Sequence, residues 1–450
     1  MARLARFLCL NGDAAKPSPL PLPPADDGDI SSRRAEVHGA GGDWSALLDP
    51  LDAGLRGELL KYGDLAQATY DGFDWRHWSP HCGTCLHGLR RLLPELGLAG
   101  HGYVATAFVY ATCDEGRAPR WLRRQLHGQA WEGHANWIGY VAVAGAAEAA
   151  RAGYRDIAVA WRGTIAPGEW LLDMRTRMVP FEVDAGKDKG AKVARGFYSM
   201  YTSKNAGSKN GERSAREQVA GEVARLVSHF RGRGEELRVT FTGHSLGGAL
   251  ALLAARDAAA AHPGVPVAAV TFSAPRVGNR AFCEGLTSRG VRVLRVAVRH
   301  DVVPLVPSVP RVVVDAPFSK ALAKLWALTG RPPSWAYVHA GDELELDVRK
   351  SPFLKHAYDV LGFHNLETCL HLLDGREGAA AAFRPGARRD LALVNKTSGM
   401  LRDEARIPAW WYLPANKGLV RDALGRWVVA EREHDDLPVP DDRLPLSELD

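Results

Sequence analysis

A buried strand that turns sharply into a helix is the segment that most constrains how this chain folds. The β-branched and aromatic residues within 237–242 predict the strand, and the alanine- and leucine-rich run at residues 246–261 predicts the helix. The sequence Gly-His-Ser-Leu-Gly around Ser245 joins them, and its glycines permit a tight, strained turn. A serine on such a turn lies at a sheet edge, beside the positive end of the helix dipole. The pattern favours a nucleophilic serine over a glycine-rich turn with a capping serine.

Strands and helices alternate along most of the chain, and this alternation predicts the fold class. Strands are expected at residues 137–143, 156–161, 237–242, 267–272, 291–298 and 343–348, and helices at residues 51–70, 246–261, 279–288 and 365–373. This order indicates an α/β fold with a mostly parallel central sheet and helices on both faces. One domain is expected over residues 44–430. A disordered leader is expected at residues 1–43 and an acidic tail at residues 431–450.

The charge of the chain is distributed unevenly. The 450 residues include 57 Lys and Arg against 52 Asp and Glu, a net charge of +5. Residues 431–450 alone contain eight acidic residues and two arginines, which leaves a net charge of +11 on residues 1–430. A basic body suits anionic lipid headgroups and nucleic acid equally, so the charge by itself identifies neither partner.

Cysteine usage and the amino-terminal composition bear on the cell compartment. Six scattered cysteines favour a reducing compartment over a secreted disulfide scaffold. Cys82 and Cys85, flanked by His81 and His87, lack the second paired motif of a structural zinc site, so loop structure or a reversible disulfide is the simpler interpretation. The basic start with little acidity is compatible with an organelle transit peptide, and no run of about 20 apolar residues predicts a membrane span.

The candidate serine needs a base within hydrogen-bonding reach and an acid that orients this base. Asp301 follows the strand expected at residues 291–298 and is the candidate acid, with a turn aspartate before Pro304 as the alternative. The chain has sixteen histidines, and their spacing does not identify which of them is the base. His364 stands at a loop-to-helix junction and His339 precedes the strand at residues 343–348, so either ring could face the serine.

An oxyanion formed at the serine needs at least two hydrogen-bond donors. One is expected to be the backbone N–H of Leu246, which follows the nucleophile. The other is expected at the end of the strand at residues 156–161. There Gly163 permits a close approach, and Thr164 adds an N–H and a hydroxyl. A purely structural turn is the alternative for this segment.

Linked motifs give the chain a family resemblance. Four of them, in this order, resemble the class 3 lipase family: residues 161–164 (Trp-Arg-Gly-Thr), 243–250 (Gly-His-Ser-Leu-Gly-Gly-Ala-Leu), 273–279 (Ser-Ala-Pro-Arg-Val-Gly-Asn) and 301–304 (Asp-Val-Val-Pro). More narrowly, residues 44–52, 62–70, 364–367 (His-Asn-Leu-Glu) and 416–420 (Asn-Lys-Gly-Leu-Val) resemble the plant phospholipases that remove the sn-1 acyl chain. The resemblance covers residues 44–430.

The resemblance implies an α/β-hydrolase fold with a Ser-Asp-His triad, formed here by Ser245, Asp301 and one histidine. In the lipase family the base lies at the position that His364 occupies, so the resemblance favours His364 over His339. No metal or other cofactor is implied.

The resemblance also assigns the groups around the triad. It implies that Thr164 and Leu246 form the oxyanion hole, and that the segment after Thr164 is a lid. The alternative for this segment is permanent core. Its apolar side chains include Ile165, Trp170, Leu171 and Met174.

The predicted function is a lipid acyl hydrolase that releases the sn-1 fatty acid from phospholipids through an acyl-enzyme intermediate. Galactolipase, triacylglycerol lipase and a catalytically silent hydrolase-like receptor are the alternatives, because motifs do not describe the headgroup pocket. A membrane lipid surface is the expected partner, bound peripherally, and nucleic acid is not expected. The chloroplast is the expected location, with the cytoplasm as the alternative.

Overall fold

A computed structural model describes most of the chain. The described residues are 30–39, 44–76, 79–112, 135–164, 177–181, 189–307, 336–357, 359–412, 419–421, 423–429 and 431–449. The lid residues expected at Ile165, Trp170, Leu171 and Met174 lie outside these ranges.

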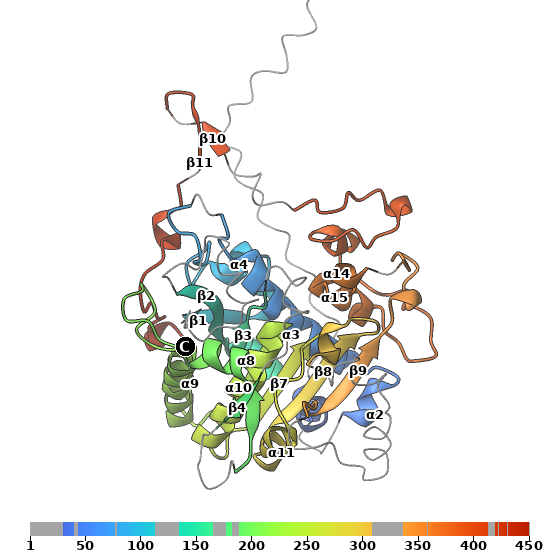
Figure 1. The fold of residues 1–450 in the computed structure, drawn as a ribbon, viewed down its shortest axis with the longest axis horizontal. Helices are drawn as coiled ribbons and strands as arrows, with labels where there is room; N and C mark the ends of the chain where they lie inside the picture. Colours follow the sequence, from blue (N-terminus) through green and yellow to red (C-terminus); the bar gives the residue numbers. More distant parts are fainter. Residues whose placement is uncertain are drawn as a thin grey trace, which may run out of the picture.

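A seven-stranded sheet forms the centre of the protein, in the order β1-β2-β3-β6-β7-β8-β9 (Figure 1). β1 and β2 pair antiparallel, as do β2 and β3, and all later neighbours pair parallel. The parallel strands therefore end at one common edge, where α/β folds place their sites. The strands are Tyr103–Ala111 (β1), Asn136–Ala144 (β2), Arg155–Trp161 (β3), Leu237–His244 (β6), Val267–Phe272 (β7), Arg292–Val298 (β8) and Asp342–Leu346 (β9).

Helices cover both faces of this sheet. α3 (Ala53–Asp71) and α15 (Leu366–Asp374) share one apolar cluster with alternate strand residues such as Tyr140 and Phe272. A second cluster on the opposite face contains residues of α8 (Arg195–Thr202), α9 (Ala215–Gly232), α10 (Leu246–Ala261) and α11 (Arg280–Ser288). Shorter helices are α1 (Arg34–Val37), α2 (Ser45–Leu48), α4 (Leu92–Glu95), α6 (Ala146–Ala152) and α14 (Val360–Phe363). Two small ribbons pair β4 (Met178–Pro180) with β5 (Lys192–Ala194), and β10 (Leu419–Arg421) with β11 (Trp427–Val429).

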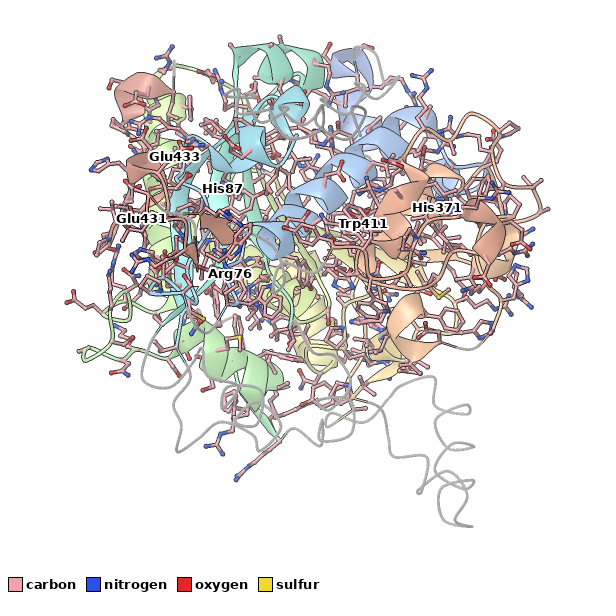
Figure 2. The ribbon with its side chains drawn as sticks, turned by 90° about the horizontal axis from the view of Figure 1, so that it is seen from above. Arg76, His87, His371, Trp411, Glu431 and Glu433 are labelled. Carbon is pink, nitrogen blue, oxygen red and sulfur yellow. The ribbon has the colours of Figure 1, made fainter. Side chains whose placement is uncertain are left out.

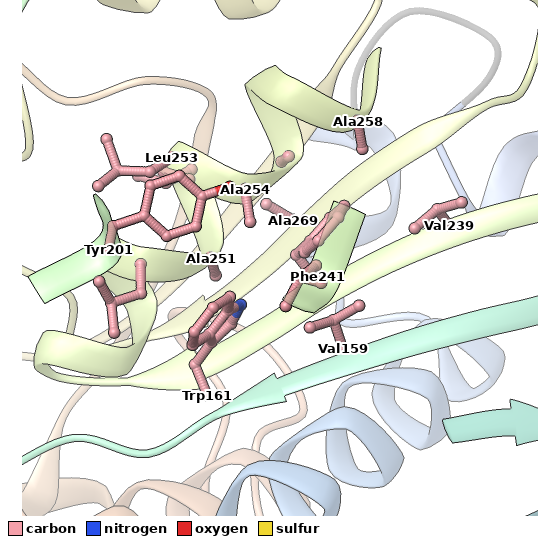
Figure 3. Packing of buried hydrophobic residues seen from close by; sticks show 14 of the residues in the cluster. Val159, Trp161, Tyr201, Val239, Phe241, Ala251, Leu253, Ala254, Ala258 and Ala269 are labelled. Carbon is pink, nitrogen blue, oxygen red and sulfur yellow. The ribbon is translucent and has the colours of Figure 1, made fainter. Parts of the chain in front are cut away.

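The packing of α10 explains how the turn before it reaches the sheet edge. Figure 3 shows Trp161 and Phe241 of the sheet below the small side chains of α10, among them Ala251 and Ala254. All four are buried. Alanine allows the helix to lie close to the sheet, so the start of α10 is held near the ends of β3 and β6.

The expected α/β fold class is confirmed, and two elements have the predicted bounds. The helix at residues 246–261 is α10, and the strand at residues 267–272 is β7. β1 and α9 are absent from the sequence-based expectations. β1 mixes alanine with large apolar residues, a pattern that does not separate a strand from a helix, and pairing with β2 makes it a strand.

The expected leader and the expected acidic tail both contain residues that are buried in the domain. Ile30 and Val37, within the expected leader, are buried in the cluster that contains α3. Leu444 and Leu449, within the expected acidic tail, are buried in the cluster on the opposite face. The Leu444 N–H donates to the Thr106 carbonyl of β1 at 2.8 Å. The described part of the tail therefore lies against the sheet.

Acidic groups of the tail form ion pairs with arginines of the body. Glu448 pairs with Arg90 at 2.6 Å, and Glu433 pairs with Arg91. Figure 2 labels Glu433 and also His87, which precedes these arginines in the chain. The tail thus compensates part of the positive charge of residues 1–430 locally.

The remaining sequence features concern membranes and metals. Within the described ranges, no helix combines the length and the apolar character needed to cross a bilayer. Cys82 and Cys85 are free thiols, and Cys85 forms an isolated bridge with Phe73, so their segment is a local loop. Within the same ranges, no group of three or more His, Cys, Asp or Glu side chains could hold a metal ion.

Candidate active site

Ser245 occupies a strained turn between β6 and α10. Its backbone has φ 58° and ψ −127°, a left-handed conformation that a side chain rarely adopts. The Ser245 N–H donates to the Phe272 carbonyl of β7 at 2.9 Å, which fixes the turn to the sheet. A Cβ at Gly243 would collide with the Gly247 backbone, and one at Gly247 with the Trp161 carbonyl, so both positions require glycine. The Ser245 hydroxyl is buried and forms no hydrogen bond within the described part of the chain.

Asp301 and His364 form a buried pair. The Asp301 Oδ2 lies 2.8 Å from the His364 Nδ1, and neither side chain is more than 2% exposed. The other carboxylate oxygen accepts the Val303 N–H at 2.9 Å, so the turn after β8 holds the acid. Because an ionised carboxylate only accepts hydrogen bonds, the proton of a neutral His364 ring lies on Nδ1. Its Nε2 then carries the lone pair that a general base needs.

The pair lies next to the serine turn. His364 ends α14, directly before Asn365, whose side chain caps α15 by accepting the Thr368 N–H at 3.1 Å. The His364 ring centroid is 4.6 Å from that of His244, the residue before Ser245. The structure therefore brings the sequence-predicted Asp301 and His364 together, next to the residue that precedes Ser245.

The expected oxyanion segment also reaches the serine. A Cβ added at Gly163 would stand 3.2 Å from the Ser245 Cβ, so only glycine allows this approach. Thr164 follows and is partly buried, and its hydroxyl has no hydrogen-bond partner among the described residues. Leu246 is the first residue of α10, where backbone N–H groups have no partner within the helix. Both expected donor segments thus lie beside Ser245.

His339 is placed differently. Its Nε2 donates to the Pro304 carbonyl at 2.7 Å, in the turn that follows Asp301. Burial lowers the pKa of His339 to about 3, which keeps the ring neutral. His339 therefore stabilises the turn that carries Asp301. Within the described part of the chain, its ring forms no hydrogen bond to Asp301.

Sequence reasoning missed two side chains at this site. In the sequence, His244 is only the variable position of the Gly-His-Ser-Leu-Gly motif. Tyr70 is only the last residue of the helix expected at residues 51–70. The Tyr70 hydroxyl lies 2.8 Å from the His244 Nδ1, and the His244 Nε2 lies 2.8 Å from the His364 carbonyl oxygen. No signal in a single sequence links residues 70, 244 and 364, because only the packing of α3 on the sheet brings them together.

Comparisons with known proteins show the family to which this chain is similar. The family model described as Lipase (class 3) matches residues 158–310. Phospholipase A1-Igamma1, chloroplastic, of Arabidopsis thaliana is 42% identical over 420 residues, which cover 90% of this chain and 80% of the relative. Phospholipase A1-II 6 of Oryza sativa subsp. japonica is 42% identical over 429 residues, covering 91% and 97%.

A solved lipase from Rhizopus microsporus var. chinensis is 20% identical, with a TM-score of 0.40 over 76% of this chain and 86% of that one. The identity to the plant enzymes extends over at least 90% of this chain and at least 80% of each relative. The chain therefore belongs to the plant phospholipase A1 group of the class 3 lipase family.

Proposed function

We propose that this protein hydrolyses the sn-1 acyl ester of phospholipids, with Ser245 as nucleophile, His364 as base and Asp301 as the orienting acid. One observation carries the proposal. The His364 Nδ1 and the Asp301 carboxylate are 2.8 Å apart in a buried site next to the strained turn of Ser245, whose hydroxyl has no hydrogen-bond partner among the described residues. This combination is the requirement of a serine hydrolase.

In the first half-reaction, the Ser245 Oγ attacks the ester carbonyl carbon while the His364 Nε2 removes the hydroxyl proton. Asp301 keeps the Nδ1 proton in place and stabilises the imidazolium ion. The N–H groups of Thr164 and Leu246 hold the oxyanion. His364 then returns its proton to the leaving alcohol oxygen as the carbon–oxygen bond breaks, which leaves an acyl-enzyme and a lysophospholipid.

In the second half-reaction, a water molecule replaces the alcohol. His364 removes a proton from this water, whose oxygen attacks the acyl carbonyl. The second tetrahedral intermediate collapses, the Ser245 Oγ recovers the proton from His364, and the fatty acid leaves. The same donors serve both intermediates, because the oxyanion forms on the same carbonyl oxygen.

Substrate class and location rest on the relatives. Both plant relatives are named phospholipase A1, and the Arabidopsis protein is named chloroplastic. We therefore propose a membrane phospholipid as substrate, met at a lipid surface, and the chloroplast as the location.

Position-labelled lipids test the function. The full chain is incubated with phosphatidylcholine, galactolipid and triacylglycerol labelled at defined acyl positions, and released fatty acid is measured. We expect release from the sn-1 position of phosphatidylcholine, and a loss of at least about 10³-fold in Ser245→Ala. Release by Ser245→Ala at a rate near that of the wild type would remove Ser245 from the mechanism. Preferred release from galactolipid would change the substrate class.

A fluorescent fusion tests the location. The full chain is compared with a variant that lacks residues 1–29, a deletion that keeps the buried Ile30 and Val37. We expect the full chain in chloroplasts and the shortened chain in the cytosol. Identical cytosolic signals from both fusions would contradict the transit-peptide role.

A further inference from the structure

Tyr70 and His244 connect the three segments that carry the candidate catalytic groups. Tyr70 lies in the last turn of α3, and His244 ends β6 immediately before Ser245. Neither side chain belongs to the triad. His244 is 6% exposed, and its ring lies between the tyrosine and the base: the ring centroids are 5.7 Å from Tyr70 and 4.6 Å from His364.

The hydrogen bonds of this pair have a defined direction. The His364 carbonyl oxygen can only accept, so the His244 Nε2, at 2.8 Å, carries the proton. In a neutral ring, the Nδ1 is then an acceptor, and the Tyr70 hydroxyl at 2.8 Å donates to it. A single chain of bonds thus runs from Tyr70 through His244 to the backbone of His364.

Protonation states agree with this direction. Burial, followed by the nearby His364, lowers the pKa of His244 well below its ordinary value, so the ring stays neutral. Burial raises the pKa of the Tyr70 hydroxyl, which therefore remains a donor. The tautomer of His244 is consequently the same throughout the neutral pH range.

Tyr70 also touches the oxyanion segment. A Cβ at Gly163 would collide with the Tyr70 hydroxyl oxygen and with the His244 carbonyl oxygen. The Gly163 backbone also acts on this hydroxyl group, because it opposes the rise that burial causes in the Tyr70 pKa. The Tyr70 hydroxyl is therefore in contact with Gly163, which precedes Thr164. It is also in contact with His244, which precedes Ser245.

We infer that Tyr70 and His244 are positioning residues that hold the nucleophile turn, the oxyanion segment and the backbone of the base in one geometry. This inference rests on the proposed function and concerns the same site. Neither side chain reaches the reacting atoms. They act through His364, whose Nε2 must point at the serine for proton transfer, and through Gly163, which precedes the Thr164 donor.

The test uses a soluble short-chain ester, because its hydrolysis reports on the triad independently of any lipid surface. Active enzyme is counted by labelling Ser245 with a fluorophosphonate, and kcat and KM are measured for Tyr70→Phe. We expect kcat to fall about ten-fold, with KM within about two-fold of the wild type, because the lost bond positions catalytic groups and does not bind substrate. The low-field proton resonance of the His364–Asp301 bond should shift or broaden.

Two substitutions of His244 sharpen the test. The amide of a glutamine reaches about as far as the Nε2 and can still donate to the His364 carbonyl, whereas an asparagine amide reaches only about as far as the Nδ1. His244→Gln should therefore keep a kcat several-fold higher than that of His244→Asn. Equal kcat values for the two variants would overturn the role of the bond to His364.

Tyr140→Phe is the matched control. Its hydroxyl is also buried and donates to a backbone carbonyl, that of Leu65, at 2.9 Å, but it has no contact with the triad. We expect a lower melting temperature with kcat retained. A wild-type kcat in Tyr70→Phe, or an equal loss of kcat in Tyr140→Phe, would overturn the inference. A wild-type chain that neither hydrolyses the ester nor reacts with the fluorophosphonate would overturn the proposed function as well.

Discussion

At the scale of single residues, the proposed base is harder to identify from the sequence than the proposed nucleophile and acid. Ser245 is recognisable because its turn chemistry is local, and Asp301 because it follows a strand. Among the described histidines, His364 is distinguished by its neighbour in space, the Asp301 carboxylate at 2.8 Å. His339 lies in the same region but bonds to the Pro304 carbonyl.

Alanine substitutions distinguish the two histidines. His364→Ala removes the proposed proton acceptor, and we expect kcat/KM for a short-chain ester to fall at least about 10³-fold. His339→Ala removes a bond to the turn after Asp301, and we expect a loss of less than about ten-fold together with a lower melting temperature. An inactive His339→Ala beside an active His364→Ala would reverse the assignment of the base.

At the scale of elements, a buried arginine ties the helix that follows the base to the helix beside it. The Arg389 Nη1 lies 2.7 Å from the Asp64 Oδ1 of α3, and the Nη2 lies 2.6 Å from the Glu367 Oε2 of α15. Burial raises the pKa of Glu367 even though Arg389 opposes this effect. Burial also acts on Asp64, but Arg389 and His101 lower its pKa overall.

Replacement of this arginine should destabilise the fold in a pH-dependent way. Arg389→Met removes the guanidinium group that pairs with the buried carboxylates of Asp64 and Glu367. We expect a loss of about 3–5 kcal/mol in the free energy of unfolding near pH 8. Both carboxyl pKa values then rise, so the folded state takes up protons and the loss becomes smaller as the pH falls toward 5. Urea unfolding at both pH values measures this difference.

Arg349→Met is the control for this measurement. Arg349 pairs with Asp347 at 2.6 Å, but its side chain is 54% exposed. We expect no measurable change in the free energy of unfolding, because an exposed ion pair contributes little. An equal loss in both variants, or a loss in Arg389→Met that does not change with pH, would contradict the role of the buried pair.

The elements also show where sequence reasoning succeeds. α10 and β7 have the predicted bounds, because alanine-rich or apolar runs between turn residues define both ends locally. β1 depends on its pairing with β2, and Tyr70 depends on the position of α3 over the ends of β3 and β6. Both are consequences of tertiary packing, which no local pattern contains.

At the scale of the whole molecule, the uneven charge has a spatial arrangement. The tail acids Glu433, Asp441 and Glu448 pair with Arg91, Arg213 and Arg90 of the body. These surface pairs contribute little stability individually, but they reduce the positive potential of the body on the side where the tail lies.

Vesicle binding measures this surface charge. Because the net charge is +5, we expect the full chain to bind vesicles that contain anionic lipid more tightly than neutral vesicles. The difference should decrease as the ionic strength rises, since salt screens exposed charges. Sedimentation with Ser245→Ala separates binding from hydrolysis. An affinity for anionic vesicles that does not change with salt would contradict an electrostatic attraction.

The contact between Leu444 and Thr106 has a consequence for synthesis on the ribosome. β1 is an edge strand, and the residues that cover its edge, Arg443 and Leu444, come more than 330 positions later in the chain. While the chain is being translated, this edge stays open to pairing with other nascent strands. Chains that are released after β9 but before Arg443 would contain every strand of the sheet and still have an unprotected edge, so we expect chaperones to bind them.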